Sequence, residues 1–333
     1  MARTVKLGLI GCGGIMDWHV RNYQDIKQAK IAALTDVEGK QIANTVGKHP
    51  ELGDLPTFSD YGKMIAEVEL DGVVIATPHT LHFEQIMTCL DHGLHVLTEK
   101  PMVCSVDHAK KVMRKAKKTD KVVMISYQRH FSPAFRLAKK MIEEGKLGKL
   151  TFVSALQAQD WLRGTKGLWR QDPKLSGGGQ LNDSGSHLVD IMLWVTGLEP
   201  ASVFAEINNR GTKVDILSAL TLKFKGGAIG TLSVVGDAPG WWEDITFYGE
   251  EGGLYVRGDQ LLHSYRGKAK WEAELKEMTA KSKYSSNFDK NFVASILGRE
   301  EPQTPPVCGL RVMQLTESAW ESARTGKPVK VRG

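Results

Sequence analysis

The chain has 333 residues, 41% of them hydrophobic and 25% charged, which is typical of a globular enzyme large enough for two domains. The formal net charge of +6 is mild, and no recognisable basic module or apolar run of transmembrane length occurs. We therefore expect no nucleic-acid partner and no membrane span. The N-terminus lacks a signal-peptide pattern and the four cysteines form no CxxC pair, so we expect reduced thiols and a cytoplasmic location.

The first 127 residues alternate between strand-like and helix-like patterns. Apolar runs predict strands over residues 5–10, 30–35, 72–76, 95–98 and 122–127. Apolar positions at helical spacing predict helices over residues 14–26, 83–91 and 106–118. Strands alternating with helices indicate a parallel sheet covered on both faces, which we assign to an N-terminal domain of residues 1–127.

Residues 128–333 show a different pattern and form the second expected domain. Strands are predicted at 150–159, 202–208, 217–224, 228–235, 244–248, 254–256 and 260–265. Gly226-Gly227 predicts a hairpin between two of them, and Glu251-Gly252-Gly253 predicts another tight turn. Helices are predicted at 133–144, 184–195, 287–297 and 309–324, and a terminal helix is free to pack back on the first domain. The fold class is therefore α/β, with a doubly wound parallel sheet followed by a large, mostly antiparallel one.

A glycine-rich turn follows the first predicted strand. Gly11 permits the tight turn, while Gly13 and Gly14 let a pyrophosphate approach the backbone where the first helix begins. Met16 stands where the strict fingerprint has its third glycine. In this strand–turn–helix context the motif predicts dinucleotide binding.

Asp36 closes the second strand, where an acidic residue accepts hydrogen bonds from the adenosine ribose hydroxyls. With Glu38 nearby and no arginine at positions 37–39, NAD is favoured over NADP as the cofactor. The alternative is that Asp36 is only an N-cap for the helix beginning near Glu38.

The segment Thr77-Pro78-His79-Thr80-Leu81-His82 follows the next strand and is expected to form a loop beside the cofactor. His79 and His82 raise the alternative of a metal pair, but the loop offers no obvious third ligand. We expect no metal site.

Lys100 follows the strand at residues 95–98, and Pro101 disfavours the α conformation at Lys100. Because ligands bind at the carboxyl ends of strands in open α/β sheets, the ammonium group is expected to face the cofactor.

A glycine triplet at 177–179 leads to Asp183 and His187, which are four residues apart and share one face if the segment is helical. The alternatives are that Asp183 is the N-cap of the following helix and that His187 is a hydrogen-bonded core histidine.

Taken together, these motifs resemble the Gfo/Idh/MocA oxidoreductase family, which includes glucose-fructose oxidoreductase and inositol dehydrogenase. The matching segments run in family order: Gly11-Cys12-Gly13-Gly14, Thr77-Pro78 with His82, Glu99-Lys100-Pro101, Tyr127-Gln128-Arg129 with Phe131 and Pro133, Trp169-Arg170 with Asp172-Pro173, and Gly177-Gly178-Gly179 through Asp183 and His187. They span most of the chain and are specific for family and fold, but not for substrate.

The resemblance implies an N-terminal Rossmann domain, a C-terminal α/β domain, and a homodimer or homotetramer formed through the open sheet of the second domain. Its catalytic set falls on Lys100, Asp183 and His187. The residues assigned to the cofactor are Gly11, Gly13, Gly14, Ile15, Asp36, Thr77, Pro78, His82, Glu99 and Lys100. Those assigned to the substrate are Lys100, Arg129, Trp161, Arg163, Trp169, Arg170, Asp183 and His187.

The expected function is NAD-dependent oxidation of a secondary alcohol on a sugar, sugar derivative or cyclitol. His187 is suited to accept the proton, and Lys100 is suited to stabilise the alkoxide or to share the proton. Which of the two residues is the base therefore stays open. One alternative is a redox-neutral enzyme that retains NAD, such as a glycoside-cleaving or epimerising relative. Another is a non-catalytic dinucleotide-sensing regulator, against which the presence of Lys100, Asp183 and His187 argues.

Overall fold

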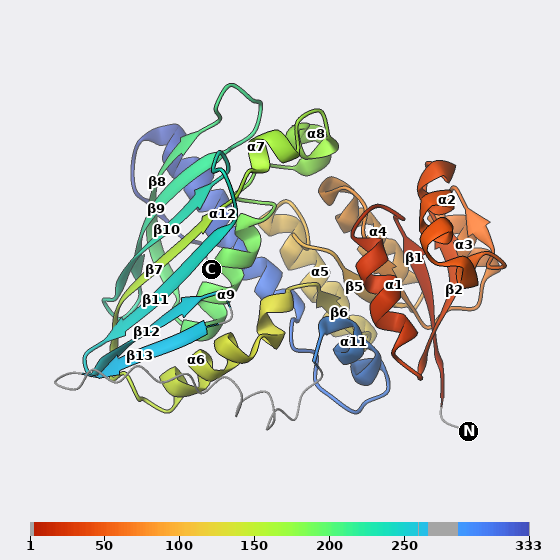
Figure 1. The fold of residues 1–333 in the computed structure, drawn as a ribbon, viewed down its shortest axis with the longest axis horizontal. Helices are drawn as coiled ribbons and strands as arrows, with labels where there is room; N and C mark the ends of the chain where they lie inside the picture. The colour runs from red at the N-terminus through yellow and green to blue at the C-terminus, as the bar shows by residue number, and fades with distance from the viewer. Residues whose placement is uncertain (1–2, 259, 266–285, 333) are drawn as a thin grey trace. The chain divides into compact units, whose positions relative to one another are not determined.

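The computed structural model describes residues 3–258, 260–265 and 286–332, which divide into two compact units (Figure 1). The first unit contains the described residues of 1–103, 107–127 and 284–307. The second contains those of 104–106, 128–283 and 308–333. Within the described part of the chain, no helix combines the length and apolar character needed to cross a membrane.

The first unit is built on a six-stranded sheet in the order β3-β2-β1-β4-β5-β6, with every neighbouring pair parallel. Its strands are β1 (Val5–Ile10), β2 (Ala29–Thr35), β3 (Thr57–Phe58), β4 (Gly72–Ile75), β5 (His95–Thr98) and β6 (Val123–Ile125). Every residue of the inner strand β4 is buried, as expected for a strand covered on both faces, and every residue of the edge strand β6 is buried as well.

Helices connect these strands, and a further helix comes from near the end of the chain. They are α1 (Met16–Gln24), α2 (Gly39–Lys48), α3 (Tyr61–Glu67), α4 (His82–Asp91), α5 (Val106–Thr119) and α11 (Phe288–Ile296). Gly93 follows α4 with a φ of +72°, which confirms the predicted glycine at the helix end. α11 comes from near the end of the chain and packs against α1 and β5 within the same unit.

The second unit is built on an eight-stranded sheet in the order β13-β12-β11-β7-β10-β9-β8-β14. Its strands are β7 (Leu150–Ala158), β8 (Pro200–Asn208), β9 (Leu217–Phe224), β10 (Ile229–Val235), β11 (Trp242–Gly249), β12 (Gly252–Arg257), β13 (Gln260–Tyr265) and β14 (Val329–Lys330). All neighbouring pairs are antiparallel except β7 with β10, so the expected fold class is confirmed. The helices are α6 (Pro133–Glu143), α7 (Trp161–Gly164), α8 (Pro173–Ser176), α9 (Gly185–Thr196) and α12 (Pro306–Thr325).

The hairpin between β9 and β10 turns at Gly226 and Gly227, whose φ values of +86° and +98° suit glycine. The turn predicted at 251–253 lies slightly earlier, because Gly252 and Gly253 already belong to β12. The helix expected to begin near Glu38 is α2, which has Glu38 as its N-cap. α3 and β3 were not among the predicted elements; β3 is only two residues long, and α3 is a seven-residue helix.

Candidate active site

The carboxyl ends of three neighbouring strands meet at one edge of the first sheet. Ile10 of β1 is in register with Ile75 of β4, which is in register with Thr98 of β5. The ladder continues beyond the strand ends, since the Ala76 N–H donates to the Ile10 carbonyl and the Glu99 N–H donates to the Ile75 carbonyl. This edge therefore places the glycine turn, the Thr77 loop and Lys100 next to one another.

The glycine turn is shaped for close approach on one side and is open on the other. Gly11 has a φ of +89°, and a Cβ there would lie 2.8 Å from the backbone of Ala76. A Cβ added to Gly13 or Gly14 would meet nothing within 4 Å. The open side adjoins the N-terminus of α1, where backbone N–H groups and the helix dipole favour a phosphate. Ile15, at the N-cap of α1, is 37% exposed.

Asp36 organises the turn with both of its carboxylate oxygens. Oδ2 accepts the N–H of Cys12 at 2.8 Å, and Oδ1 accepts the N–H of Glu38 at 2.9 Å. The N-cap of α2 is Glu38, so the N-cap alternative for Asp36 is wrong. Each oxygen keeps a further lone pair, so the carboxylate fits two ribose hydroxyls.

His82 links the loops that follow β4 and β5. Its Nε2 lies 2.9 Å from the carbonyl oxygen of Thr77, and its Nδ1 lies 2.8 Å from that of Pro101. The side chain is fully buried, and burial lowers its pKa. Both ring nitrogens are directed at carbonyl oxygens rather than at a metal position shared with His79. His82 therefore bridges the loop at Thr77 and the loop at Pro101.

Glu99 belongs to a buried network that the sequence analysis missed. Its carboxylate accepts the N–H of Lys100 at 3.2 Å and lies 3.3 Å from Nε2 of His19 in α1. The other ring nitrogen of His19 lies 2.8 Å from Oδ1 of Asp289 in α11. Burial tends to raise the pKa of Glu99, but His19 and Lys100 outweigh it and lower that pKa overall. Glu99 therefore stays ionised beside Lys100.

In the second unit, the glycine triplet allows a tight backbone contact. A Cβ on Gly179 would lie 2.0 Å from the carbonyl oxygen of Asp215. The carboxylate of Asp215 accepts the N–H groups of Gly179 and Leu181 at 2.9 and 2.7 Å. The turn thus held leads directly into Asp183.

The Asp183 carboxylate is fixed from two sides. Its Oδ2 accepts Nε1–H of Trp161 at 2.8 Å and Nε–H of Arg170 at 3.2 Å. α9 begins at Gly185 with Ser184 as its N-cap, so the N-cap alternative for Asp183 is wrong. His187 lies in the first turn of α9 and is half-buried, which does not fit the core-histidine alternative.

The other substrate candidates divide into two groups. Arg170 contacts Asp183, and Trp169 lies beside Arg170, with the guanidinium carbon 4.5 Å from the ring centroid. Arg163 is exposed and pairs with Asp160 and Asp237. Arg129 is buried, is paired closely with Glu243, and donates to Gln157 at 3.4 Å. Trp161, Arg170 and Asp183 are thus brought together, whereas Arg163 and Arg129 are tied to other carboxylates.

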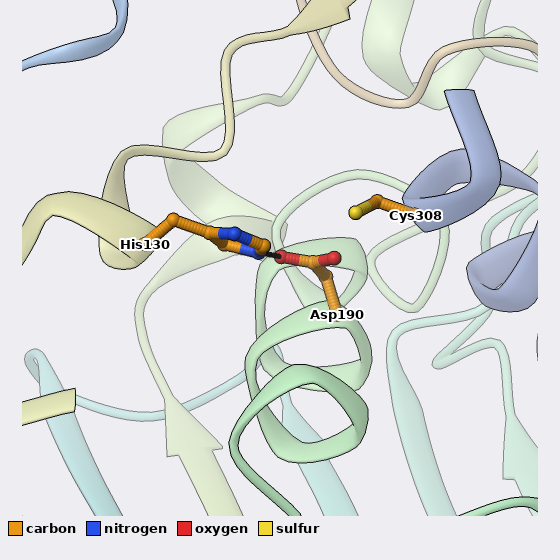
Figure 2. A group of neighbouring side chains, drawn as sticks. All are labelled: His130, Asp190 and Cys308. Atoms are coloured by element: carbon orange, nitrogen blue, oxygen red, sulfur yellow. Dashed lines mark hydrogen bonds and ion pairs between the residues drawn. The ribbon is translucent and has the colours of Figure 1, made fainter. Parts of the chain in front are cut away.

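One group of three potential metal ligands occurs within the described residues: His130, Asp190 and Cys308. Figure 2 shows the imidazole of His130 pointing at the Asp190 carboxylate, with Cys308 on the far side of that carboxylate. The His130 Nε2 to Asp190 Oδ2 distance is 2.7 Å, a direct hydrogen bond that leaves no room for an ion between them. Burial raises the pKa of the Cys308 thiol well above its usual range, so it stays protonated. We interpret this cluster as structural.

The strand order, the glycine turn and the acidic residue after β2 define a Rossmann-type dinucleotide-binding protein joined to a second α/β unit. Residues 5–127 match the model of an oxidoreductase family with an NAD-binding Rossmann fold, and residues 135–255 match the GFO/IDH/MocA C-terminal domain. The chain belongs to the Gfo/Idh/MocA oxidoreductase family, and its first domain is the family's NAD-binding domain.

Individual relatives support the same assignment. The rhizopine catabolism protein MocA of Rhizobium meliloti is 32% identical over 202 residues, which span 59% of this chain and 59% of MocA. The chain thus matches only about three fifths of that relative's length. Myo-inositol 2-dehydrogenase of Thermotoga maritima is 26% identical over 98% of both chains. A similar solved structure is the WlbA dehydrogenase from Bordetella pertussis in complex with NADH and UDP-GlcNAcA. It superposes with a TM-score of 0.87 at 23% identity, and the match covers 100% of this chain and 99% of that one.

Proposed function

We propose that the protein is an NAD-dependent dehydrogenase that oxidises a secondary alcohol of a sugar, a sugar derivative or a cyclitol. The observation that carries this proposal is the shared sheet edge, where the glycine turn, the Thr77 loop and Lys100 follow three strands in register. A cofactor lying along that edge would have its pyrophosphate at Gly13 and Gly14 and its nicotinamide toward Lys100. Bound NAD supplies the hydride acceptor.

The protein groups then handle the proton and the charge on the alcohol oxygen. In this proposal Lys100 stabilises the developing alkoxide, and His187 accepts the proton. Either residue can be the base. Asp183, held by Trp161 and Arg170, orients the imidazole or binds a neighbouring hydroxyl.

The substrate class is inferred from the side chains around Asp183 and from the relatives. Trp169 offers an aromatic face for the apolar side of a sugar ring, and Arg170 offers guanidinium N–H donors for hydroxyl or carboxylate oxygens. Relatives named for myo-inositol and for a complex with UDP-GlcNAcA fit a polyol or sugar-derived substrate.

We also propose that the open face of the second sheet joins two or more copies of the chain. Ile229 and Tyr248 are 47% and 40% exposed there, and the ring of Tyr248 lies 6.5 Å from Phe152 and 5.8 Å from Tyr255. Such an apolar stripe across neighbouring strands suits an interface. Light scattering is expected to give a dimer or tetramer mass, and a monomer at micromolar concentration would contradict this assignment.

The experiment that tests the function is a panel of polyols, aldoses, sugar acids and inositols, each incubated with NAD while NADH absorbance is followed. We expect one member to yield one NADH per substrate consumed. Conversion of substrate with cofactor reduction no larger than the enzyme concentration would instead identify the redox-neutral alternative. No reaction with any member, by a protein that binds NADH, would contradict both.

A further inference from the structure

Three ionisable side chains meet in the interior of the first unit, remote in sequence but close in space. His19 comes from α1, Glu99 from the residue after β5, and Asp289 from α11. The His19 ring nitrogens lie 2.8 Å from Asp289 Oδ1 and 3.3 Å from Glu99 Oε1. His19 and Asp289 are fully buried, and Glu99 is 8% exposed.

This geometry requires a charged imidazole. Each ring nitrogen of His19 faces a carboxylate, and only the doubly protonated ring donates to both. Burial alone would lower the pKa of His19, but Asp289 and Glu99 together outweigh it and raise the pKa to about 10. The cluster thus holds one buried cation between two buried carboxylates.

Further contacts connect the cluster to the proposed active site. The Glu99 carboxylate accepts the backbone N–H of Lys100 through Oε2, while Oε1 faces His19. On the other side, Asn22 of α1 donates from Nδ2 to Asp289 Oδ2 at 2.7 Å. The Phe288 ring packs edge-on against the His19 ring, with centroids 5.4 Å apart. The backbone that carries Lys100 is therefore connected, through Glu99 and His19, to α1 and α11.

We propose that His19 is a positioning residue for the reaction, which fixes Glu99 between α1 and α11 and thereby orients the backbone from which Lys100 extends. His19 has no exposed surface, so it acts through Glu99 rather than on cofactor or substrate. This inference rests on the proposed role of Lys100 as the group at the alcohol oxygen.

The test compares His19→Gln with a matched variant, His95→Gln. His95 is the first residue of β5, at the end of the strand opposite to Glu99. His95 is half-buried and its Nδ1 accepts the N–H of Val122 at 2.9 Å, so its replacement also removes a hydrogen bond within the sheet. Burial lowers the pKa of His95 to about 4, so this variant removes no charge at neutral pH. Both variants are expected to lower the melting temperature.

Only His19→Gln is expected to change the reaction. We expect kcat to fall by about tenfold to a hundredfold because Lys100 is displaced, while the Kd for NADH and the substrate KM stay within about threefold. If His19 had only a structural role, His19→Gln would lower the melting temperature without lowering kcat selectively at an unchanged KM.

A second readout needs no substrate. The pH dependence of amine labelling at Lys100, read by peptide mass spectrometry, reports the charge around its ammonium group. Lys100 perturbs the pKa values of Glu99 and His82, and burial keeps His82 neutral. Removing the His19 cation leaves Glu99 uncompensated, so the labelling midpoint is expected to rise by about one pH unit in His19→Gln and not in His95→Gln.

Equal kcat and equal labelling midpoints in the two variants would overturn the inference. If His19→Gln does not fold, Asp289→Asn takes its place, because it releases His19 from α11 and is expected to lower kcat with the same unchanged NADH affinity. An Asp289→Asn protein with wild-type kcat would equally overturn it. If the proposed role of Lys100 is wrong, the Lys100→Ala variant will turn over at the wild-type rate. In that case the comparison of labelling midpoints still tests whether His19 acts on Lys100.

Discussion

The indole Nε1 of Trp161 donates a 2.8 Å hydrogen bond to Oδ2 of Asp183, the same oxygen that accepts Nε–H of Arg170. The Trp161 ring is 4% exposed and packs with Val214 and Ile216, so the donor is rigid. A carboxylate fixed in this way presents its other oxygen in a defined direction. Trp161 therefore holds the Asp183 carboxylate, and its buried ring offers no exposed face on which a sugar could stack.

Trp161→Phe is expected to reduce kcat by about tenfold, because a hydrogen bond to a charged group contributes roughly 1.5–3 kcal/mol while the packing is largely kept. Trp320→Phe is the comparison variant, since the Trp320 indole also donates to a buried carboxylate, that of Asp215, at 3.2 Å. Because Asp215 holds the turn before Asp183 but does not contact Asp183 itself, a smaller loss of kcat is expected in Trp320→Phe than in Trp161→Phe. Steady-state kinetics and melting temperatures of both variants check this. Equal losses of stability with no kcat difference would mean that the Trp161 bond is only structural.

Asp36→Asn is expected to lower the preference for NAD over NADP by about tenfold or more, because it removes the negative charge that opposes a 2′-phosphate. Asparagine keeps one acceptor oxygen, which matters because the Asp36 carboxylate also holds the N–H groups of Cys12 and Glu38. The ratio of kcat/KM for the two cofactors measures the effect. Glu38→Gln removes a nearby charge from an exposed side chain and is the control. If Asp36→Asn keeps the wild-type ratio, Asp36 has a purely structural role.

The buried His19 imidazolium predicts a pH dependence of stability. Its pKa is raised from 6.5 to about 10, so the folded state retains a proton that the unfolded state loses. The contribution is fully present below about pH 6.5 and is lost as the pH rises through about 10. Between pH 7 and 10, the free energy of unfolding should fall by a few kcal/mol more in the wild type than in His19→Gln, measured by denaturant titration. In His95→Gln, the free energy of unfolding should depend on pH as it does in the wild type, since His95 titrates below this range. The same pH dependence in all three proteins would contradict a charged His19.

The sheet edge that carries the cofactor residues follows from local sequence patterns. β1, β4 and β5 are continuous apolar runs, and the residues just after such runs must lie at the carboxyl edge of a parallel sheet. Lys100 could therefore be placed from its sequence neighbours alone.

The His19 network could not be predicted in this way. Asp289 lies 270 positions beyond His19, and no local pattern links a histidine in an amphipathic helix to an aspartate in another. The only available signals were polar residues on apolar helix faces, Asp289 between Phe288 and Phe292 and His19 next to Val20. Trp161 shows the same limit, because tertiary packing decides whether a tryptophan lines a site or braces a carboxylate.

The most direct test of the central claim is the turnover of Lys100→Met, a variant that keeps the length of the side chain and removes its ammonium group. With the substrate found in the panel, we predict that kcat falls by at least about a hundredfold while the Kd for NADH changes by less than about threefold. Turnover near the wild-type rate, in a variant that binds NADH normally, would contradict the account.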